Sequence, residues 1–242
     1  MNTRDELKRN LAQVEEIIDA ACRRSGRSRG EITLIAVTKM HPATAIAAAA
    51  ELGITHIGEN KVQEFDSKQP EWNALRAKHP LQSHLIGHLQ SNKAARAAAL
   101  FDTVDSVDSL RLAERLEAAA ATSNRVLPVL IEIKLSEEES KSGAAPGSPE
   151  LEQLLERLPS LTHLAPRGLM TVPPYLRDAE AVRPYFRRLR ELRDEYSRHH
   201  PKLQLKALSM GMTHDYAVAI EEGATEIRLG TALFGARDYS SA

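Results

Sequence analysis

The sequence is poor in several features that mark particular classes of protein. Its 242 residues include one cysteine, Cys22, so the chain can form neither an intramolecular disulfide nor a cysteine metal cluster. Aromatic residues make up only 4% of the chain, but 42% hydrophobic residues still provide enough apolar material for a core. With 32 basic and 33 acidic residues the net charge is −1, which gives no long-range attraction for nucleic acid or an anionic membrane.

Targeting and membrane segments are also missing from the pattern. No stretch has the apolar length needed to cross a bilayer, and the N-terminal MNTRDELKRN lacks the apolar core of a secretory signal. We therefore expect a cytoplasmic protein that binds neither nucleic acid nor a membrane. The arginines between positions 183 and 193 are interleaved with acidic residues, which predicts a solvated helix face.

The nine histidines predict no metal site. His84 and His88 fall on one predicted strand, where four residues span about 13 Å and cannot share an ion held at about 2 Å.

The hydrophobic pattern predicts an α/β fold. Apolar residues at three- and four-residue steps predict a leading helix over residues 1–24, and short β-branched runs then alternate with longer helical segments. Eight strands are the number that closes a (β/α)8 TIM-type barrel, so we expect a single domain over 1–242 with the barrel at 31–235. An open doubly wound sheet would show a glycine fingerprint after its first strand, which residues 38–42 lack. The predicted strands are 32–39, 56–59, 83–89, 102–107, 126–135, 164–172, 205–210 and 225–230, and the helices between them are 42–52, 91–100, 110–121, 151–158, 178–199 and 214–222.

A lysine ends the first predicted strand. Strand alternation puts Lys39 on the same face as Ile35 and Val37, and Pro42 then begins a helix. Lys39 is therefore expected at the carboxyl end of its strand, where barrels of this kind carry their chemistry. A lysine that is partly desolvated or close to another cation has a lowered pKa and becomes a nucleophile; a solvated lysine at a strand end is the alternative.

The last two predicted strands end in residues suited to a phosphate. Residues 208–213 read LSMGMT and open a helix, and the following strand ends in Arg228, Gly230 and Thr231. We expect hydroxyls, backbone N–H groups and a guanidinium to converge there, because the loops after strands seven and eight form the recurrent phosphate site of such barrels. The alternative is that Ser209 and Thr231 cap helices and Arg228 pairs with a core carboxylate. A lysine opposite a phosphate site suggests pyridoxal 5'-phosphate, abbreviated PLP.

Ordered motifs across nearly the whole chain resemble the pyridoxal phosphate homeostasis protein family. Each motif is weak alone, and together they form a specific pattern that begins with Lys39 and ends with the two phosphate loops. The motifs are VTK (37–39), GENKVQE (58–64), HLIGHLQSNK (84–93), SVDS (106–109), SEEESKSG (136–143), GLM (168–170), LSMGMTHD (208–215) and IRLGTALFG (227–235).

This resemblance implies a fold-type III PLP barrel similar to the N-terminal domain of alanine racemase, with PLP held as a Schiff base on Lys39. Arg228 would lie beside either the pyridine nitrogen or the phosphate. Lys134, where many relatives carry asparagine, is either a second reactive amine or a solvated residue. The implied cofactor-binding residues are Lys39, Asn60, Ser209, Met210, Gly211, Arg228, Gly230 and Thr231.

The function that the resemblance implies is PLP homeostasis, by buffering the cofactor or delivering it to apo PLP-dependent enzymes. We expect no catalytic residue, and a monomer rather than a dimer. The alternative is an amino-acid racemase or decarboxylase, which needs an acid/base partner on the opposite cofactor face. In alanine racemase that partner comes partly from a second, β-rich domain, and only residues 236–242 follow Gly235 here. A sensor module that acts through a surface partner is a third possibility.

Overall fold

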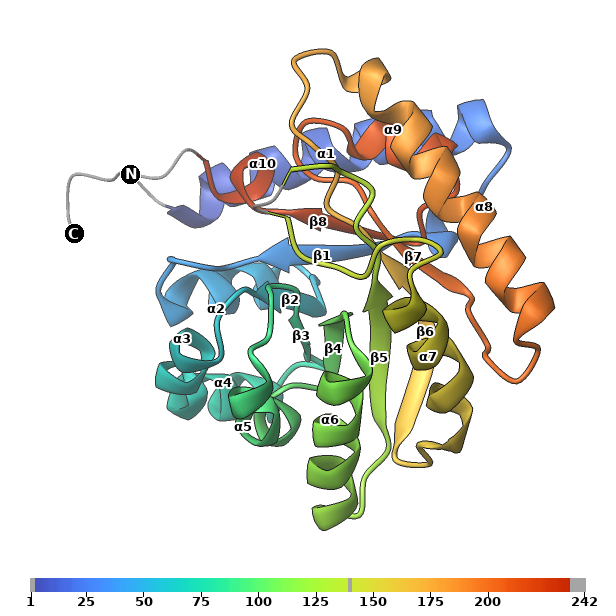
Figure 1. Cartoon of the computed structure of the whole chain (residues 1–242). Coiled ribbons are helices and arrows are strands. Elements are labelled where there is room, and N and C mark those ends of the chain that lie inside the picture. Colours follow the sequence, from blue (N-terminus) through green and yellow to red (C-terminus); the bar gives the residue numbers. More distant parts are fainter. Residues whose placement is uncertain (1–2, 139–140, 236–242) are drawn as a thin grey trace.

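Eight parallel strands close into a barrel in the computed structural model, which describes residues 3–138 and 141–235 (Figure 1). Each strand pairs with the next, and β8 returns to β1, with Thr33 opposite Glu226. The predicted TIM-type barrel is confirmed, although most strands end earlier than predicted because the chain turns away as soon as ladder pairing stops. The strands are β1 (Thr33–Val37), β2 (His56–Glu59), β3 (Gln82–Leu85), β4 (Thr103–Val107), β5 (Leu127–Glu132), β6 (Leu164–Met170), β7 (Ala207–Ser209) and β8 (Glu226–Leu229).

Helices surround the barrel and connect successive strands, as the alternating pattern predicts. The helices α3, α4 and α10 are additions to the predicted set. The α-helices are α1 (Thr3–Ser25), α2 (Ala43–Glu51), α3 (Val62–Ser67), α4 (Gln69–Arg76), α5 (Ala94–Leu100), α6 (Leu110–Thr122), α7 (Pro149–Arg157), α8 (Arg183–His199), α9 (Tyr216–Glu221) and α10 (Thr231–Phe234). Short 3-10 turns lie at Arg29–Glu31, Ser91–Lys93, Leu158–Ser160 and Ala179–Val182.

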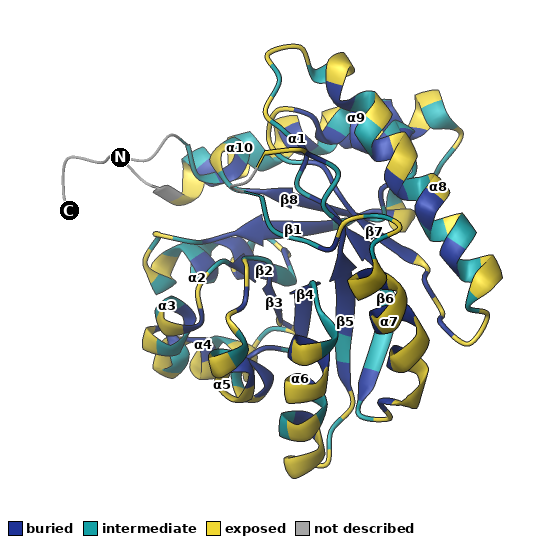
Figure 2. Ribbon diagram, viewed as in Figure 1, coloured by how far each residue is buried: buried dark blue, intermediate teal, exposed yellow. Residues whose placement is uncertain are grey.

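Local sequence explains why these helices begin where they do and which face they bury. The Ser109 hydroxyl accepts a hydrogen bond from the Leu112 N–H at the start of α6, which satisfies one unpaired amide of the first turn. Leu112, Leu116 and Ala120 then recur at four-residue steps and are fully buried. Figure 2 shows the strands mostly in the colour of buried residues, and β4 is buried along its whole length, as expected for a parallel sheet covered by helices.

The leading helix is confirmed as α1, which packs beside α9 and α10 (Figure 1). Its buried side chains include Val14, Ile18 and Cys22. Ile17 is 43% exposed although Ile18 is fully buried, because adjacent residues of a helix are turned about 100° from each other. Burial of the single cysteine is consistent with a structural thiol, and burial also raises the pKa of Cys22.

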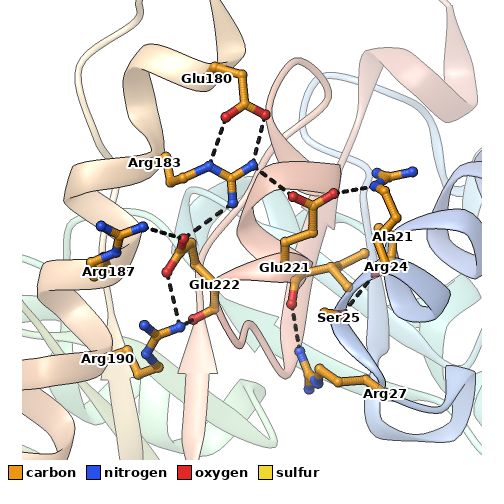
Figure 3. A network of polar contacts seen from close by, with 11 residues as sticks. Ala21, Arg24, Ser25, Arg27, Glu180, Arg183, Arg187, Arg190, Glu221 and Glu222 are labelled. Carbon is orange, nitrogen blue, oxygen red and sulfur yellow. Dashed lines mark hydrogen bonds and ion pairs between the residues drawn. The ribbon is translucent and has the colours of Figure 1, made fainter.

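The arginines of α8 match the predicted solvated face in part: the Arg187 and Arg188 side chains are 53% and 49% exposed, whereas Arg183 is only 24% exposed. Arg183 forms ion pairs with Glu180, with Glu221 and with Glu222, at N–O distances of 2.7, 2.7 and 3.2 Å. Figure 3 shows that this network joins α8 to the end of α9, where Arg24 of α1 also reaches Glu221. Because the partners belong to neighbouring helices, the arginines join α8, α9 and α1 as well as carrying charge on the surface.

A loop over residues 133–148 connects β5 to α7, with residues 139–140 outside the described chain. Ala144 forms an isolated parallel bridge with Ile133, which ties the later part of the loop to the end of β5. Among the described helices, none has the length and apolarity required to span a membrane.

Candidate cofactor site

A cavity of about 340 Å³ opens at the carboxyl ends of the barrel strands. Its volume lies in the range of about 300–1,000 Å³ that is typical of small-molecule sites. The wall combines apolar side chains with polar ones that lie at or after the ends of five different strands. The lining residues are Val37, Lys39, Asn60, Ile86, Val172, Pro174, Tyr175, Met212, Thr213, His214, Asp215, Arg228, Gly230 and Thr231.

Lys39 reaches this cavity from a tight turn directly after β1. The His41 N–H donates to the Thr38 carbonyl at 3.0 Å, so Lys39 occupies the second position of the turn. Met40, in the third position, has a φ of 61°, in the left-handed region that is unusual for a residue with a Cβ. The turn thus ends the strand and presents Lys39 at the cavity wall.

Arg228 is a buried cation near the end of β8, the last strand of the barrel. Its guanidinium donates to the Ser209 hydroxyl at 2.8 Å and to the Thr171 carbonyl at 2.7 Å. Burial lowers the pKa of Arg228 from its ordinary value, while nearby Asp105 and Glu132 raise it. The sequence left open that Ser209 caps a helix and that Arg228 pairs with a carboxylate. In the structure the two residues contact each other directly.

The turn after β7 depends on a glycine. Gly211 has a φ of 96°, and a Cβ placed on it would lie 2.6 Å from the Ala219 Cβ. Only glycine fits this conformation and this space. The adjacent Thr213 hydroxyl accepts from the Ala232 N–H at 3.1 Å, which joins the loop after β7 to the loop after β8. The two predicted phosphate loops are thus brought together.

Five of the eight predicted site residues line the cavity directly: Lys39, Asn60, Arg228, Gly230 and Thr231. Ser209, Met210 and Gly211 are buried at the end of β7, where Ser209 holds Arg228. The backbone of Asn60 packs closely against the backbone of Gly87. A Cβ added at position 87 would lie only 2.3 Å from the Asn60 carbonyl oxygen. The Lys134 side chain is half-buried at the start of the loop after β5.

Sequence reasoning missed three polar residues of the cavity. Tyr175 is 75% exposed at its mouth, and its ring lies 5.4 Å from the ring of His214. Asp215 is buried and accepts from the Met212 N–H at 2.7 Å, and burial raises its pKa. Tyr175 follows a Pro-Pro pair without periodic pattern, so only the fold could bring it to the cavity.

Glu132, at the end of β5, is a buried acid near Arg228. Its Oε2 atom has no hydrogen-bond partner among the described residues. Burial and, to a smaller extent, the nearby Asp108 carboxylate raise the pKa of Glu132 to about 7, against the lowering effect of Arg228. This carboxyl therefore changes charge near neutral pH.

A separate polar group lies deeper in the barrel, toward the amino ends of the strands. His84 Nδ1 lies 3.0 Å from Asp105 Oδ2, its Nε2 lies 2.8 Å from His56 Nδ1, and Arg167 pairs with Glu226. Burial opposes protonation of His84, but Asp105 outweighs it and raises the His84 pKa, whereas burial lowers the pKa of His56 to about 4. A protonated His84 then donates to both neighbours.

Possible ligand atoms of His84, Asp105 and Glu226 all lie within 4.8 Å of one another. No sequence pattern predicts this group, because its members lie on three strands far apart in the chain. A further cavity of about 560 Å³ opens at the same end of the barrel, and its lining includes Arg167 and Glu226.

Comparisons with known proteins place this chain in one class of fold. Residues 4–238 match the family model described as "Alanine racemase, N-terminal domain". Solved alanine racemases share the fold: the enzyme of Clostridium difficile 630 in complex with cycloserine has a TM-score of 0.69 at 13% identity, over 98% of this chain and 61% of that chain. At this identity the likeness concerns the fold alone.

Curated relatives are much closer in sequence. The pyridoxal phosphate homeostasis protein of Aquifex aeolicus is 43% identical over 95% of this chain and 97% of its own, and that of Escherichia coli K12 is 41% identical over 98% and 99%. The structure of PipY from Synechococcus elongatus PCC7942 with PLP bound has a TM-score of 0.79 at 39% identity, over 90% of this chain and 100% of that chain. The chain belongs to the pyridoxal phosphate homeostasis protein family, as its motifs predicted.

Proposed function

We propose that this protein binds pyridoxal 5'-phosphate in the cavity at the carboxyl ends of the strands and serves PLP homeostasis. The observation that carries the proposal is the placement of Lys39, Arg228, Gly230 and Thr231 around one cavity in a chain of this family. The PLP-bound structure of a relative 39% identical supports it.

The residues present fit the cofactor. PLP supplies an aldehyde that condenses with a primary amine and a phosphate that needs hydrogen-bond donors. Lys39 supplies the amine. The backbone N–H groups of Gly211, Gly230 and Thr231 would donate to the phosphate, with the Thr231 hydroxyl beside them.

Arg228 is the main positive charge that the cavity wall holds in a fixed position, because Ser209 and Thr171 orient its guanidinium. It would attract an anionic group or face the ring nitrogen. In the second case a fixed cation disfavours protonation of that nitrogen and weakens the ring as an electron sink. Either arrangement is compatible with storage of the cofactor.

We infer that the protein holds and releases the cofactor without turning over a substrate, and that apo PLP-dependent enzymes receive it. The names of the relatives, which refer to homeostasis, support this reading. We also propose that the chain is a single domain, since the described residues form one closed barrel with its own core, and that it is a monomer.

Mass spectrometry of borohydride-reduced protein tests the site. The purified protein should be yellow, and the reduced adduct should map to Lys39 and be absent from a folded Lys39→Ala variant. An adduct on another lysine, Lys134 included, would refute the assignment. Cys22→Ser is the matched control and should keep the adduct.

Two activity assays test the role. Transfer to an apo-enzyme should be faster from loaded protein than from the same concentration of free PLP; equal rates would favour a sensor. Racemization or decarboxylation of amino acids faster than with free PLP would favour the enzyme alternative.

A further inference from the structure

A cluster of charged side chains lies directly behind the Lys39 turn. Lys68, in the turn between α3 and α4, donates from Nζ to Glu59 Oε1 at 2.8 Å and to Glu64 Oε1 at 3.0 Å. It also donates to the Thr38 carbonyl at 3.0 Å. An ammonium group has three N–H donors, so each donor of Lys68 has one acceptor in this cluster.

The cluster forms hydrogen bonds with both residues that flank Lys39. On one side, the Thr38 hydroxyl donates to Glu59 Oε1 at 2.7 Å, and the Thr38 carbonyl accepts from Lys68. On the other side, the Met40 N–H donates to Glu64 Oε1. Lys39 thus lies between two backbone positions that are held by the same three charged side chains.

Burial makes these contacts strong and specific. Thr38 and Glu59 are fully buried, and the Lys68 side chain is 9% exposed. Charged groups that leave water in this way are retained only where their partners compensate, and breaking one contact leaves the other groups unpaired. Burial also raises the pKa of Glu59, against the lowering effect of Lys68 and Thr38.

Met40 is the residue that needs such support. Its φ of 61° is unfavourable for a residue with a Cβ, and its side chain is 62% exposed and so gains little from packing. The hydrogen bond from its N–H to Glu64 is therefore a main local reason for this conformation. If Met40 relaxed to a negative φ, the turn would change and Lys39 would leave its present direction.

We propose that Lys68, Glu59 and Glu64 form a positioning cluster that fixes the turn containing Lys39 and thereby aims its amine into the cavity. This inference rests on the proposed function, in which Lys39 captures the cofactor aldehyde. The cluster acts on the backbone on each side of Lys39 and does not itself contact the cofactor.

The test measures the rate at which the apo-protein captures PLP, followed by absorbance, with reduced-adduct mass spectrometry to confirm Lys39. Glu64→Ala should slow capture by about tenfold or more, because a misaligned nucleophile reacts slowly. Glu64→Gln, which keeps an oxygen acceptor for the Met40 N–H, should stay within about twofold of wild type.

Rescue separates positioning from a general loss of folding. Met40→Gly adopts a positive φ without strain, so Glu64→Ala in the Met40→Gly background should capture PLP within about twofold of Met40→Gly alone. Lys68→Met should slow capture like Glu64→Ala, whereas Lys61→Met, the same change at an exposed position beside α3, should have no effect. Unfolding temperatures of all variants show whether they fold.

The outcomes distinguish the two proposals. If wild type forms no Lys39 adduct, the proposed function fails and the positioning proposal fails with it. If wild type forms the adduct but Glu64→Ala captures PLP at the wild-type rate, or the glycine background leaves the tenfold effect unchanged, only the positioning proposal fails. Equal slowing by Glu64→Gln and Glu64→Ala would indicate that charge matters and position does not, and would also overturn it.

Discussion

Glu132→Gln is expected to stabilise the cofactor-free protein at alkaline pH and to have little effect at acidic pH. Glu132 is buried at the end of β5, and its Oε2 atom has no hydrogen-bond partner among the described residues. Burial is the largest cause that raises its pKa from 4.5 to about 7, with Asp108 adding to the effect and Arg228 opposing it. Glutamine keeps the shape of the side chain but cannot ionise.

The sign follows from proton binding. Between about pH 4.5 and pH 7 the folded protein binds more protons at Glu132 than the unfolded chain does, so the free energy of unfolding falls as pH rises. The stabilisation is complete below the unfolded pKa and is lost once the pH passes about 7. A pKa raised from 4.5 to about 7 corresponds to a loss of about 3 kcal/mol, since each pH unit is worth about 1.4 kcal/mol.

Urea unfolding of the apo-protein at pH 5 and at pH 8 measures this effect. At pH 5 the variant should lie within about 1 kcal/mol of wild type, and at pH 8 it should be more stable by about 3 kcal/mol. Glu150→Gln, on the exposed face of α7, controls for the loss of an acid and should show no such divergence. Asp108→Asn should move the transition of Glu132 to lower pH. A difference between Glu132→Gln and wild type that is the same at both pH values would refute the assignment of a buried, protonated carboxyl.

Three further substitutions test the site and the scaffold. Arg228→Gln should weaken retention of PLP by about 10- to 100-fold in an absorbance titration, because a hydrogen bond to a charged group contributes about 1.5–3 kcal/mol; retention equal to that of Cys22→Ser would show that Arg228 does not contact the cofactor. Gly211→Ala should lower the free energy of unfolding by about 1–3 kcal/mol, because it adds a Cβ at positive φ in a space already filled, and unchanged stability would mean that this turn can relax. Arg183→Met should cost about 1–2 kcal/mol and become less harmful in 1 M salt; an effect independent of salt would point to lost packing instead of lost ion pairs.

Sequence pattern determined the barrel and the chemistry at its rim. The alternation of β-branched runs with amphipathic helices is a local property of the chain, so it predicted all eight strands and six of the connecting helices to within a few residues. Lys39 and Thr231 could be assigned to the cavity because every strand of a parallel barrel ends at the same rim. The motifs that identified the family lie at or after the ends of those strands.

The tertiary structure alone decided which distant side chains meet. Three hydrogen bonds join residues of different elements: Arg228 to Ser209, Lys68 to Thr38, and His84 to Asp105. Their distances depend on barrel closure and strand register, and neither quantity is encoded in local periodicity. Buried charges such as these have no signature in a hydrophobic pattern. A glutamate that becomes buried and one that stays exposed are the same letter in the sequence, and only the fold decides which of them leaves water.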